Sequence, residues 1–275
     1  MTNTLFIYDG DQVTRRVACI MASIVSMSRY AAYGDDISFE QYRRIIFVIS
    51  TKKNMLSQMT RLQKQIAGQP VGLIAVGVEK VYMDEVSDLV QQKLNQGLDF
   101  TAFVSQEHYV NEAVAAAEKI VQKVSLQDVH DTAVFQAIEA FLLKHNTGVL
   151  ATGWEGQVWS TPIEYMYYEG KIYMFSEGGK KFSNLYRNNQ VSFSVFDPFI
   201  DFSHLAGLQI DGKARMIEPD DEEYALLAAA KGIAGNRLKK MPVILHIIEI
   251  TPVQGVFLWA GFGKIKKAVR QIYCW

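Results

Sequence analysis

The chain has 275 residues, of which 49% are hydrophobic, enough for one large or two ordinary domains with substantial cores. Its 28 Lys and Arg residues against 29 Asp and Glu give a formal net charge of -1, which argues against a nucleic-acid-binding protein. The two cysteines, Cys19 and Cys274, lack a CxxC spacing, which favours a reduced, cytoplasmic setting. With neither a signal-peptide pattern nor an apolar run near the roughly 18 residues of a membrane span, we expect no membrane contact.

The first half alternates short apolar strands with amphipathic helices. The pattern predicts strands at Thr4–Tyr8, Arg29–Tyr33, Arg43–Ser50, Val71–Val78 and Asp99–Ser105. It predicts helices at Val13–Met27, Asn54–Ala67, Met83–Asn95 and Asn111–Val124. Strands and helices that alternate at this spacing form a parallel sheet with helices on both faces. We therefore expect a doubly wound α/β domain over residues 1–125.

The second half has a different pattern. One amphipathic helix is predicted at Thr132–His145 and another at Asp221–Lys231. Six strands are predicted at Gly148–Thr152, Val158–Tyr167, Lys171–Ser176, Val191–Val195, Leu208–Ile217 and Val243–Ile250, with turns at Glu155-Gly156, Glu169-Gly170 and Asp211-Gly212. Short strands joined by tight hairpins indicate an antiparallel barrel. The boundary between the halves lies near Ser125–Asp131, where no periodic pattern continues, so the second domain spans residues 126–275.

A small cationic loop precedes one of these strands. In the stretch from Ser176 to Asp197, Gly178 and Gly179 are followed directly by Lys180 and Lys181. Such a loop is an ordinary solvated segment when taken alone, because charge runs usually mark solvated faces. It also suits an anion, since glycines let backbone N–H groups approach closely and the lysines supply positive charge.

An ordered set of segments in the second half resembles the pyridoxamine-5'-phosphate-oxidase-like split-barrel flavoproteins. The matching segments are Gly148–Thr152, Thr161-Pro162, Gly170–Phe175, Lys181, Asn184-Leu185, Val191–Phe193, Gly207–Ala214 and Pro242–Leu245. The resemblance implies an FMN-binding antiparallel β split barrel, and it favours the phosphate-binding interpretation of the glycine-lysine loop.

The resemblance also implies which residues bind the cofactor. The loop around Lys181 receives the flavin phosphate, the segment Trp159–Ile163 frames the isoalloxazine ring, and the flavin lies between the subunits of a homodimer. The expected FMN-binding residues are Trp159, Ser160, Thr161, Pro162, Ile163, Phe175, Ser176, Lys180, Lys181, Asn184 and Gln209. Thr161 stands where the family commonly has an arginine, so a neutral hydroxyl replaces a bidentate cation and Lys180 is left to compensate.

The first half resembles flavodoxin-like domains, by its order of elements and by the run Phe39–Ser50. In flavodoxins the turn after the first strand holds a phosphate, and here that turn is Tyr8–Arg16. Asp9 and Asp11 place negative charge there, which disfavours an anion, although Arg15 and Arg16 could offset it. We expect a degenerate flavodoxin-like domain that serves docking or regulation; the alternative is a second FMN site.

These observations predict an FMN-binding flavoprotein, an oxidoreductase acting on a small molecule or a redox protein. No catalytic residue and no metal site is identified, because the histidines lack HExxH or comparable spacing and the flavin itself supplies redox chemistry. One alternative is a haem-binding or haem-degrading split-barrel protein, with His204 or a residue near the C-terminus as the axial ligand. The other is a non-enzymatic flavin-binding sensor whose first half is an interaction module.

Overall fold

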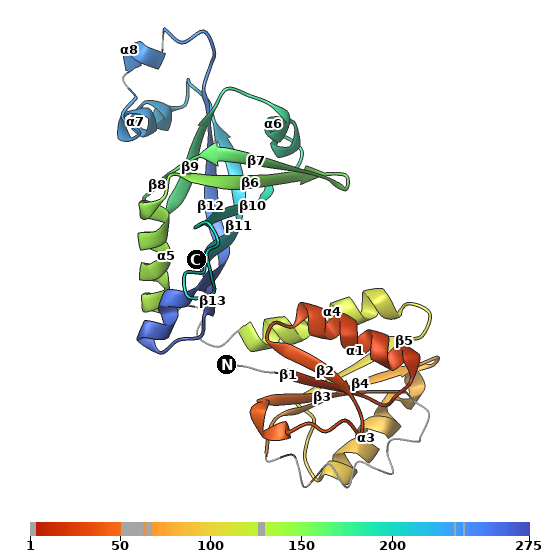
Figure 1. Ribbon diagram of the computed structural model, residues 1–275. Coiled ribbons are helices and arrows are strands. Elements are labelled where there is room, and N and C mark those ends of the chain that lie inside the picture. The colour runs from red at the N-terminus through yellow and green to blue at the C-terminus, as the bar shows by residue number, and fades with distance from the viewer. Residues whose placement is uncertain are drawn as a thin grey trace. The chain divides into compact units, whose positions relative to one another are not determined.

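The computed structural model describes residues 4–50, 63, 66, 68–125, 130–233, 235–238 and 240–275. The chain divides into two compact units, Met1–Gln127 and Asp128–Trp275 (Figure 1). Within the described part, the helices are all too short or too polar to cross a membrane.

The first unit is built on a parallel sheet. Its five strands are β1 (Thr4–Tyr8), β2 (Ser28–Ala32), β3 (Arg44–Ser50), β4 (Val71–Gly77) and β5 (Phe100–Ser105), and they pair in the order β2-β1-β3-β4-β5. All four pairings are parallel. This is the flavodoxin-like strand order, so the predicted doubly wound fold is confirmed.

Helices cover both faces of this sheet. The helices α1 (Gln12–Ile24) and α4 (Tyr109–Ser125) pack on one face, and α3 (Met83–Leu94) packs on the other (Figure 1). Side chains of β3 alternate between the two cores: Ile46 and Val48 contact the first layer, and Ile45 and Phe47 the second. Short 3-10 turns at Phe39–Gln41 and Lys80–Tyr82 lead into β3 and α3. The predicted helix at Asn54–Ala67 falls almost wholly outside the described residues.

A carboxylate ties together two strand ends at the carboxyl edge of this sheet. Asp9, which follows β1, accepts hydrogen bonds from the Ser50 backbone N–H at 2.6 Å and the Ser50 hydroxyl at 2.7 Å. Its other oxygen accepts from the Thr14 hydroxyl at 2.6 Å and the Asp11 N–H at 3.2 Å. Asp11 in turn caps α1 by accepting from the Val13 N–H at 2.8 Å. The β1–α1 turn is thus held to the end of β3 by one side chain.

The second unit is an antiparallel sheet that curls into a half-barrel. Its strands are β6 (Thr147–Trp154), β7 (Gln157–Glu164), β8 (Met166–Tyr168), β9 (Lys171–Ser176), β10 (Gln190–Phe196), β11 (Ala206–Ile217), β12 (His246–Trp259) and β13 (Arg270–Cys274). They pair in the order β7-β6-β10-β11-β12-β9-β8, and β13 pairs with β12. Helix α5 (Thr132–Lys144) packs on the inner, core-facing side of the sheet, α6 (Lys180–Leu185) follows β9, and α7 (Glu222–Ala230) and α8 (Gly235–Leu238) lie between β11 and β12. A 3-10 segment, Ala260–Ile265, precedes β13.

Close packing explains one glycine of the barrel. A Cβ on Gly148 would lie 2.3 Å from Cζ of Phe193 and 2.7 Å from the Ser194 carbonyl oxygen. The Phe193 ring is fully buried and makes an edge contact with the Tyr165 ring. The ring of a core residue therefore lies directly on the β6 backbone, which only glycine permits.

Three predicted features of the barrel were wrong. The predicted strand Val158–Tyr167 is interrupted at Tyr165 and forms two strands, β7 and β8, at opposite ends of the strand order. Asp211-Gly212 does not form a turn: both residues lie inside β11, where the register against β12 shifts and Val253 is left as an extra residue. The predicted last strand, Val243–Ile250, begins only at His246 and continues to Trp259. A β-bulge and a hairpin turn use the same Asp-Gly signal, and only strand pairing distinguishes them. The other two turns, Glu155-Gly156 and Glu169-Gly170, are confirmed.

The Asp9 contacts predict a large stability effect in the first unit. Asp9→Ala removes the acceptor of the Ser50 N–H, the Ser50 hydroxyl and the Asp11 N–H, while the Thr14 hydroxyl keeps the Asp11 carbonyl as acceptor, and it is expected to cost about 2–4 kcal/mol. All four tryptophans lie in the second unit. Urea unfolding should therefore show an earlier transition by far-UV circular dichroism and an unchanged transition by tryptophan fluorescence. Asp36→Ala, at an exposed site, is the control; equal midpoints for the two variants would contradict the role of Asp9.

The close packing at Gly148 predicts that a substitution there will change the tryptophan fluorescence transition, which Asp9→Ala leaves unchanged. Gly148→Ala forces the added methyl against Phe193 and should destabilise the second unit by about 1–3 kcal/mol. The tryptophan fluorescence transition should move to lower urea. Gly263→Ala is the matched control, because a Cβ there meets nothing within 4 Å. Wild-type stability of Gly148→Ala would show that the Phe193 ring can move aside.

Candidate functional site

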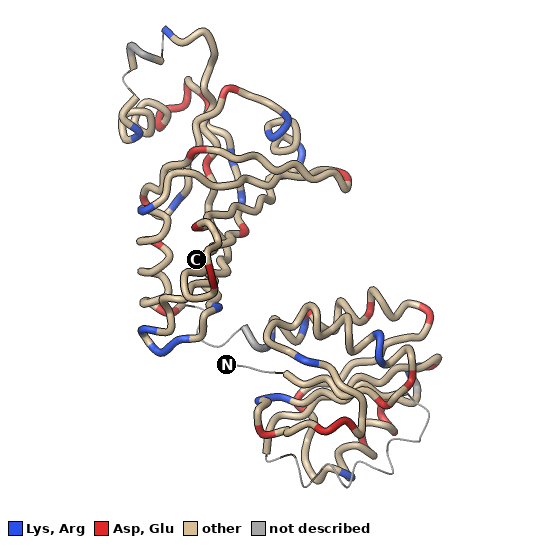
Figure 2. Tube along the Cα trace, in the orientation of Figure 1, with Lys and Arg blue, Asp and Glu red and all other residues tan. Residues whose placement is uncertain are grey.

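The glycine-lysine loop leads directly into a short helix. Gly178 and Gly179 have φ values of 139° and 105°, which side-chain-bearing residues rarely adopt, and Gly179 is the residue before α6. Lys180 and Lys181 form the first turn of α6, whose start is blue in Figure 2. The predicted helical turn is confirmed, although it begins at Lys180 rather than Phe182. The loop therefore places two lysine side chains next to glycine backbone that no side chain shields.

Lys181 is a buried cation. Lys181 is only 7% exposed, and its ammonium donates a hydrogen bond to the Gly178 carbonyl. Among the described residues, no carboxylate forms an ion pair with it. Burial lowers the pKa of the Lys181 ammonium, while the charge of Glu177 acts in the opposite direction. The ammonium also lies 5.2 Å from the centroid of the Phe182 ring. Because lysines are rarely buried without a partner of opposite charge, Lys181 is a candidate anion-binding residue.

Lys180 differs from its neighbour in being exposed. Its ammonium lies 4.9 Å from the centroid of the Trp159 ring and 3.5 Å from Oε1 of Gln157. Both partners belong to β7, so the side chain reaches from α6 to the exposed edge strand of the sheet. A cation over an indole face is held in place but keeps its charge available to a further partner.

Two polar side chains complete this inner surface. The Thr161 hydroxyl oxygen is buried and has no hydrogen-bond partner in the described structure. Asn184 of α6 is also buried, and its Nδ2 donates to the Thr152 hydroxyl at 3.1 Å. Thr161 lies opposite Leu150 on β6, and Trp159 lies opposite Thr152, so both face the core side of the sheet. The orphaned Thr161 hydroxyl is a donor ready for an added ligand.

The predicted residues therefore fall on two faces. Trp159, Thr161, Ile163, Ser176, Lys181 and Asn184 lie on the inner face, with exposed Lys180 above Trp159. Ser160 and Pro162 point to the outer face by strand alternation. Exposed Gln209 lies on that outer face too. A row of directly opposite residues crosses the sheet there, from Pro162 on β7 through Val149 on β6 and Ser194 on β10 to Gln209 on β11. Within one chain, Gln209, Ser160 and Pro162 are separated from the lysines by the thickness of the sheet.

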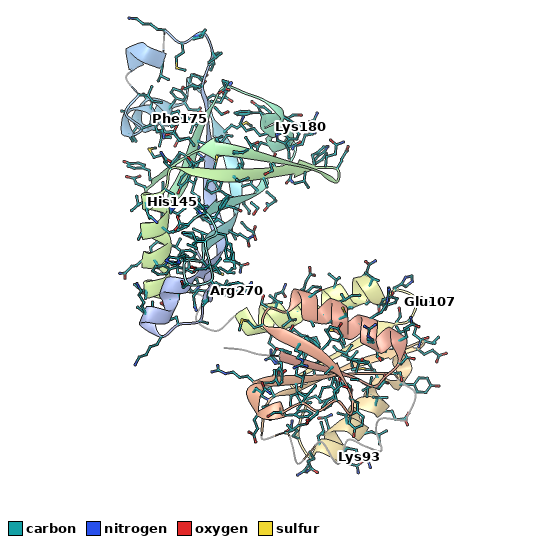
Figure 3. The ribbon with its side chains drawn as sticks, viewed as in Figure 1. Lys93, Glu107, His145, Phe175, Lys180 and Arg270 are labelled. Atoms are coloured by element: carbon teal, nitrogen blue, oxygen red, sulfur yellow. The ribbon has the colours of Figure 1, made fainter. Side chains whose placement is uncertain are left out.

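Phe175 lies elsewhere. It packs with Tyr173, Tyr224, Ile247 and their neighbours, beside α7 rather than beside Lys181. The separation of Phe175 from Lys180, which lies on α6, can be followed in Figure 3. Alternation along β9 is the reason: Ser176 faces the core, and its neighbour Phe175 must face the other way.

Sequence reasoning missed two residues of this surface. Thr152 orients Asn184, and Gln157 contacts the Lys180 ammonium. A signal for Thr152 was present, since it ends the Gly148–Thr152 segment that carries the resemblance. The sequence carried no such signal for Gln157, because its contact with Lys180 depends on the packing of α6 against β7.

In the first unit, the corresponding position is occupied by the protein itself. Doubly wound sheets of this order bind ligands where strands β1 and β3 diverge, beyond their carboxyl ends. Here that position holds the Asp9 carboxylate, which takes the hydrogen bonds of Ser50 and Thr14. Among the described residues at this edge, the Ser50 and Thr14 donors therefore already have an anionic partner.

Comparison with known proteins addresses the second unit. A family model described as pyridoxamine 5'-phosphate oxidase matches residues 134–259. A search of curated protein sequences finds no match.

Similar solved structures include a FAD-binding protein from Mesorhizobium loti, with 21% identity and a TM-score of 0.37, covering 44% of this chain and 90% of that one. A putative pyridoxamine 5'-phosphate oxidase from Listeria innocua has 21% identity and a TM-score of 0.38, covering 46% and 98%. The haem storage protein HutZ from Vibrio cholerae has 20% identity and a TM-score of 0.37, covering 42% and 88%.

The matched segment runs from the first turns of α5 to the last residue of β12, which is the part of the chain that forms the half-barrel and its glycine-lysine loop. Following a first unit of flavodoxin-like topology, the second unit of this chain is an antiparallel split barrel, and the pyridoxamine 5'-phosphate oxidase family model matches most of it.

Proposed function

We propose that the second unit binds FMN and that the protein is a flavin-dependent oxidoreductase. The observation that carries this proposal is the buried ammonium of Lys181, held in a glycine loop without a carboxylate among its described ion-pair partners. A phosphate dianion at this loop supplies the missing charge. The match to the pyridoxamine 5'-phosphate oxidase family model over residues 134–259 supports a flavin as the bearer of that phosphate.

The residues present fit this cofactor. Lys181 neutralises the phosphate, and the free Thr161 hydroxyl can donate to the bound ligand where the family's arginine is absent. Trp159 offers an aromatic face, with Lys180 held above it. The bound flavin supplies hydride and electron transfer, while the protein binds and orients it and keeps its phosphate charge balanced.

We propose further that two chains pair through the outer face of the sheet. The edge strand β7 is exposed along its length, with Val158 76% and Trp159 45% exposed. The outer row Pro162, Val149, Ser194, Gln209 and Val256 is uncharged, with Pro162 and Gln209 exposed and the other three half-buried. Pairing would let the outer residues of one copy, including Gln209, meet the inner site of the other. This explains why the predicted residues lie on two faces of one chain.

The proposal assigns one FMN to each chain. The carboxylate of Asp9 already occupies the anion position of the first unit, which is left for docking or regulation. The electron donor and acceptor are a small molecule or a redox protein, approached through the open flavin face.

Lys181→Met tests the phosphate contact. The substitution keeps an unbranched side chain in the buried position and removes its charge. We expect the Kd for FMN to rise roughly 10- to 100-fold, because one charge-assisted contact is lost. The Kd for riboflavin, which lacks the phosphate, should stay within about two-fold. Flavin fluorescence quenching measures both constants.

Lys264→Met, at an exposed site in the same unit, is the control and should bind both flavins normally. Equal losses for FMN and riboflavin would mean that Lys181 serves packing rather than the phosphate. A protein that refuses FMN but gives a Soret band on adding haem would replace the flavin proposal with the haem alternative. Two FMN molecules per chain, counted by mass after release, would contradict the assignment of Asp9.

Val256→Arg tests the pairing. Val256 lies opposite Gln209 on the outer face, so a charge there should oppose association. We expect a shift from dimer to monomer by light scattering, with a parallel loss of FMN affinity. Leu226→Arg on α7, where the side chain is 63% exposed, should leave both unchanged. A wild type that is monomeric with FMN bound would overturn the shared site.

A further inference from the structure

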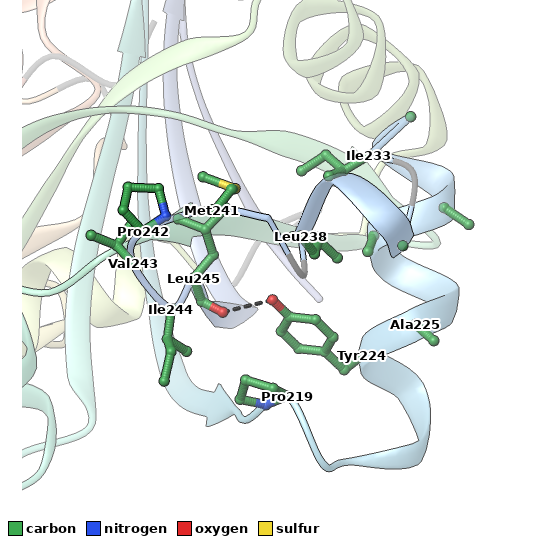
Figure 4. Close-up of a pocket in the computed structure, with 14 residues that line it drawn as sticks. Pro219, Tyr224, Ala225, Ile233, Leu238, Met241, Pro242, Val243, Ile244 and Leu245 are labelled. Atoms are coloured by element: carbon green, nitrogen blue, oxygen red, sulfur yellow. Dashed lines mark hydrogen bonds between the residues drawn. The ribbon is translucent and has the colours of Figure 1, made fainter.

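A large apolar cavity lies on the side of the barrel that carries α7 and α8. It has a volume of about 820 Å³ and is bounded by α7, α8 and the segment that leads into β12 (Figure 4). Its walls include Tyr224 and Ala228 of α7, Leu238 of α8, and Met241, Ile244 and Leu245 of the connecting segment. None of its fourteen lining residues belongs to the flavin site proposed above.

The walls of this cavity are fixed to the barrel. The Tyr224 hydroxyl donates to the Leu245 carbonyl at 2.7 Å, joining α7 to the opposite wall. Arg215 of β11 contacts Glu223 of α7 at 2.5 Å, and its Nε donates to Glu249 of β12 at 2.7 Å. Glu249 is only 2% exposed and also accepts from Tyr173. These contacts hold the helix above the strands, so the cavity is formed before a ligand arrives.

The described lining of this cavity contains no charged side chain. Of the described residues that line it, every one is apolar, glycine, proline or tyrosine. One carboxylate beside the lining has a partner outside it: Glu218, next to lining Pro219, is 2.5 Å from Nδ1 of His246, next to lining Leu245. His246 in turn contacts the Phe182 ring of α6, with centroids 5.4 Å apart. A charged ligand would find no partner in such a lining.

We propose that this cavity binds an uncharged, predominantly apolar small molecule. Its volume lies within the range of small-molecule sites, which are mainly apolar with a few polar groups. Val243 and Ile244 at its rim are 44% and 62% exposed, so the entrance of the cavity presents apolar surface to solvent. The Tyr224 hydroxyl is the polar group that can orient a bound molecule.

The test uses the full chain and the uncharged dye Nile red as the probe, followed by its fluorescence enhancement. Ala229→Trp fills the cavity from α7, since Ala229 lines it. Ala230→Trp is the matched control, because Ala230 is exposed on the same helix and lies outside the lining. We expect wild type and Ala230→Trp to bind alike, and Ala229→Trp to bind at least roughly ten-fold more weakly.

A second variant keeps the test independent of helix packing. Ile244→Glu places a charge at the exposed rim and should also weaken Nile red binding, while the FMN content stays as in wild type. Equal Nile red binding by wild type, Ala229→Trp and Ile244→Glu would overturn the proposal. Dye binding that appears only on dilution to the monomer would overturn it as well, because a second copy would then cover the cavity. Loss of FMN binding in Lys181→Met with Nile red binding retained would separate this site from the flavin site.

Discussion

The long antiparallel pair of β11 and β12 is the constraint on which the second unit depends. These strands carry β10, β9 and β13 on their free edges, and their register shifts once, where Val253 is left unpaired opposite Asp211 and Gly212. Such a bulge bends a strand and increases its twist, so the sheet can curl around α5. The same two strands hold Arg215 and Glu249, which anchor α7 on the other side. The curl of the half-barrel, the position of the glycine-lysine loop after β9 and the apolar cavity beside α7 all depend on this one ladder.

The two units treat negative charge in opposite ways. In the second unit a lysine is buried beside a glycine loop, and burial lowers the pKa of its ammonium. In the first unit an aspartate reaches across two strand ends and satisfies the donors that an external anion would use. At this edge, where doubly wound sheets of this order bind ligands, the Ser50 and Thr14 donors are thus already bonded to a side chain of the protein itself.

Strand alternation organises the candidate site more than sequence proximity does. Trp159, Thr161 and Ile163 face inward, and Ser160 and Pro162 between them face outward. A run of five neighbouring residues can therefore serve two surfaces at once. In a paired barrel one surface would hold a flavin from the inside, while the other would complete the site of the second copy.

The sequence by itself determined most of the elements and their order, because apolar periodicity and turn residues act locally. The five-stranded parallel sheet, the glycine-lysine loop and the barrel strands from Gly148 to Ile217 follow from it, except that Val158–Tyr167 is divided into β7 and β8. Tertiary structure alone decided what depends on partners distant in the chain. It turned Asp211-Gly212 into a bulge rather than a turn, extended β12 to Trp259 and paired β13 with it. It also places Phe175 on the side of the sheet that faces α7 and leaves the Thr161 hydroxyl without a described hydrogen-bond partner. The hydrogen bonds from Ser50 to Asp9 likewise depend on residues far apart in the chain. Hydrogen bonding and packing between segments far apart in sequence have no local signature, and they settle which of several locally allowed arrangements is formed.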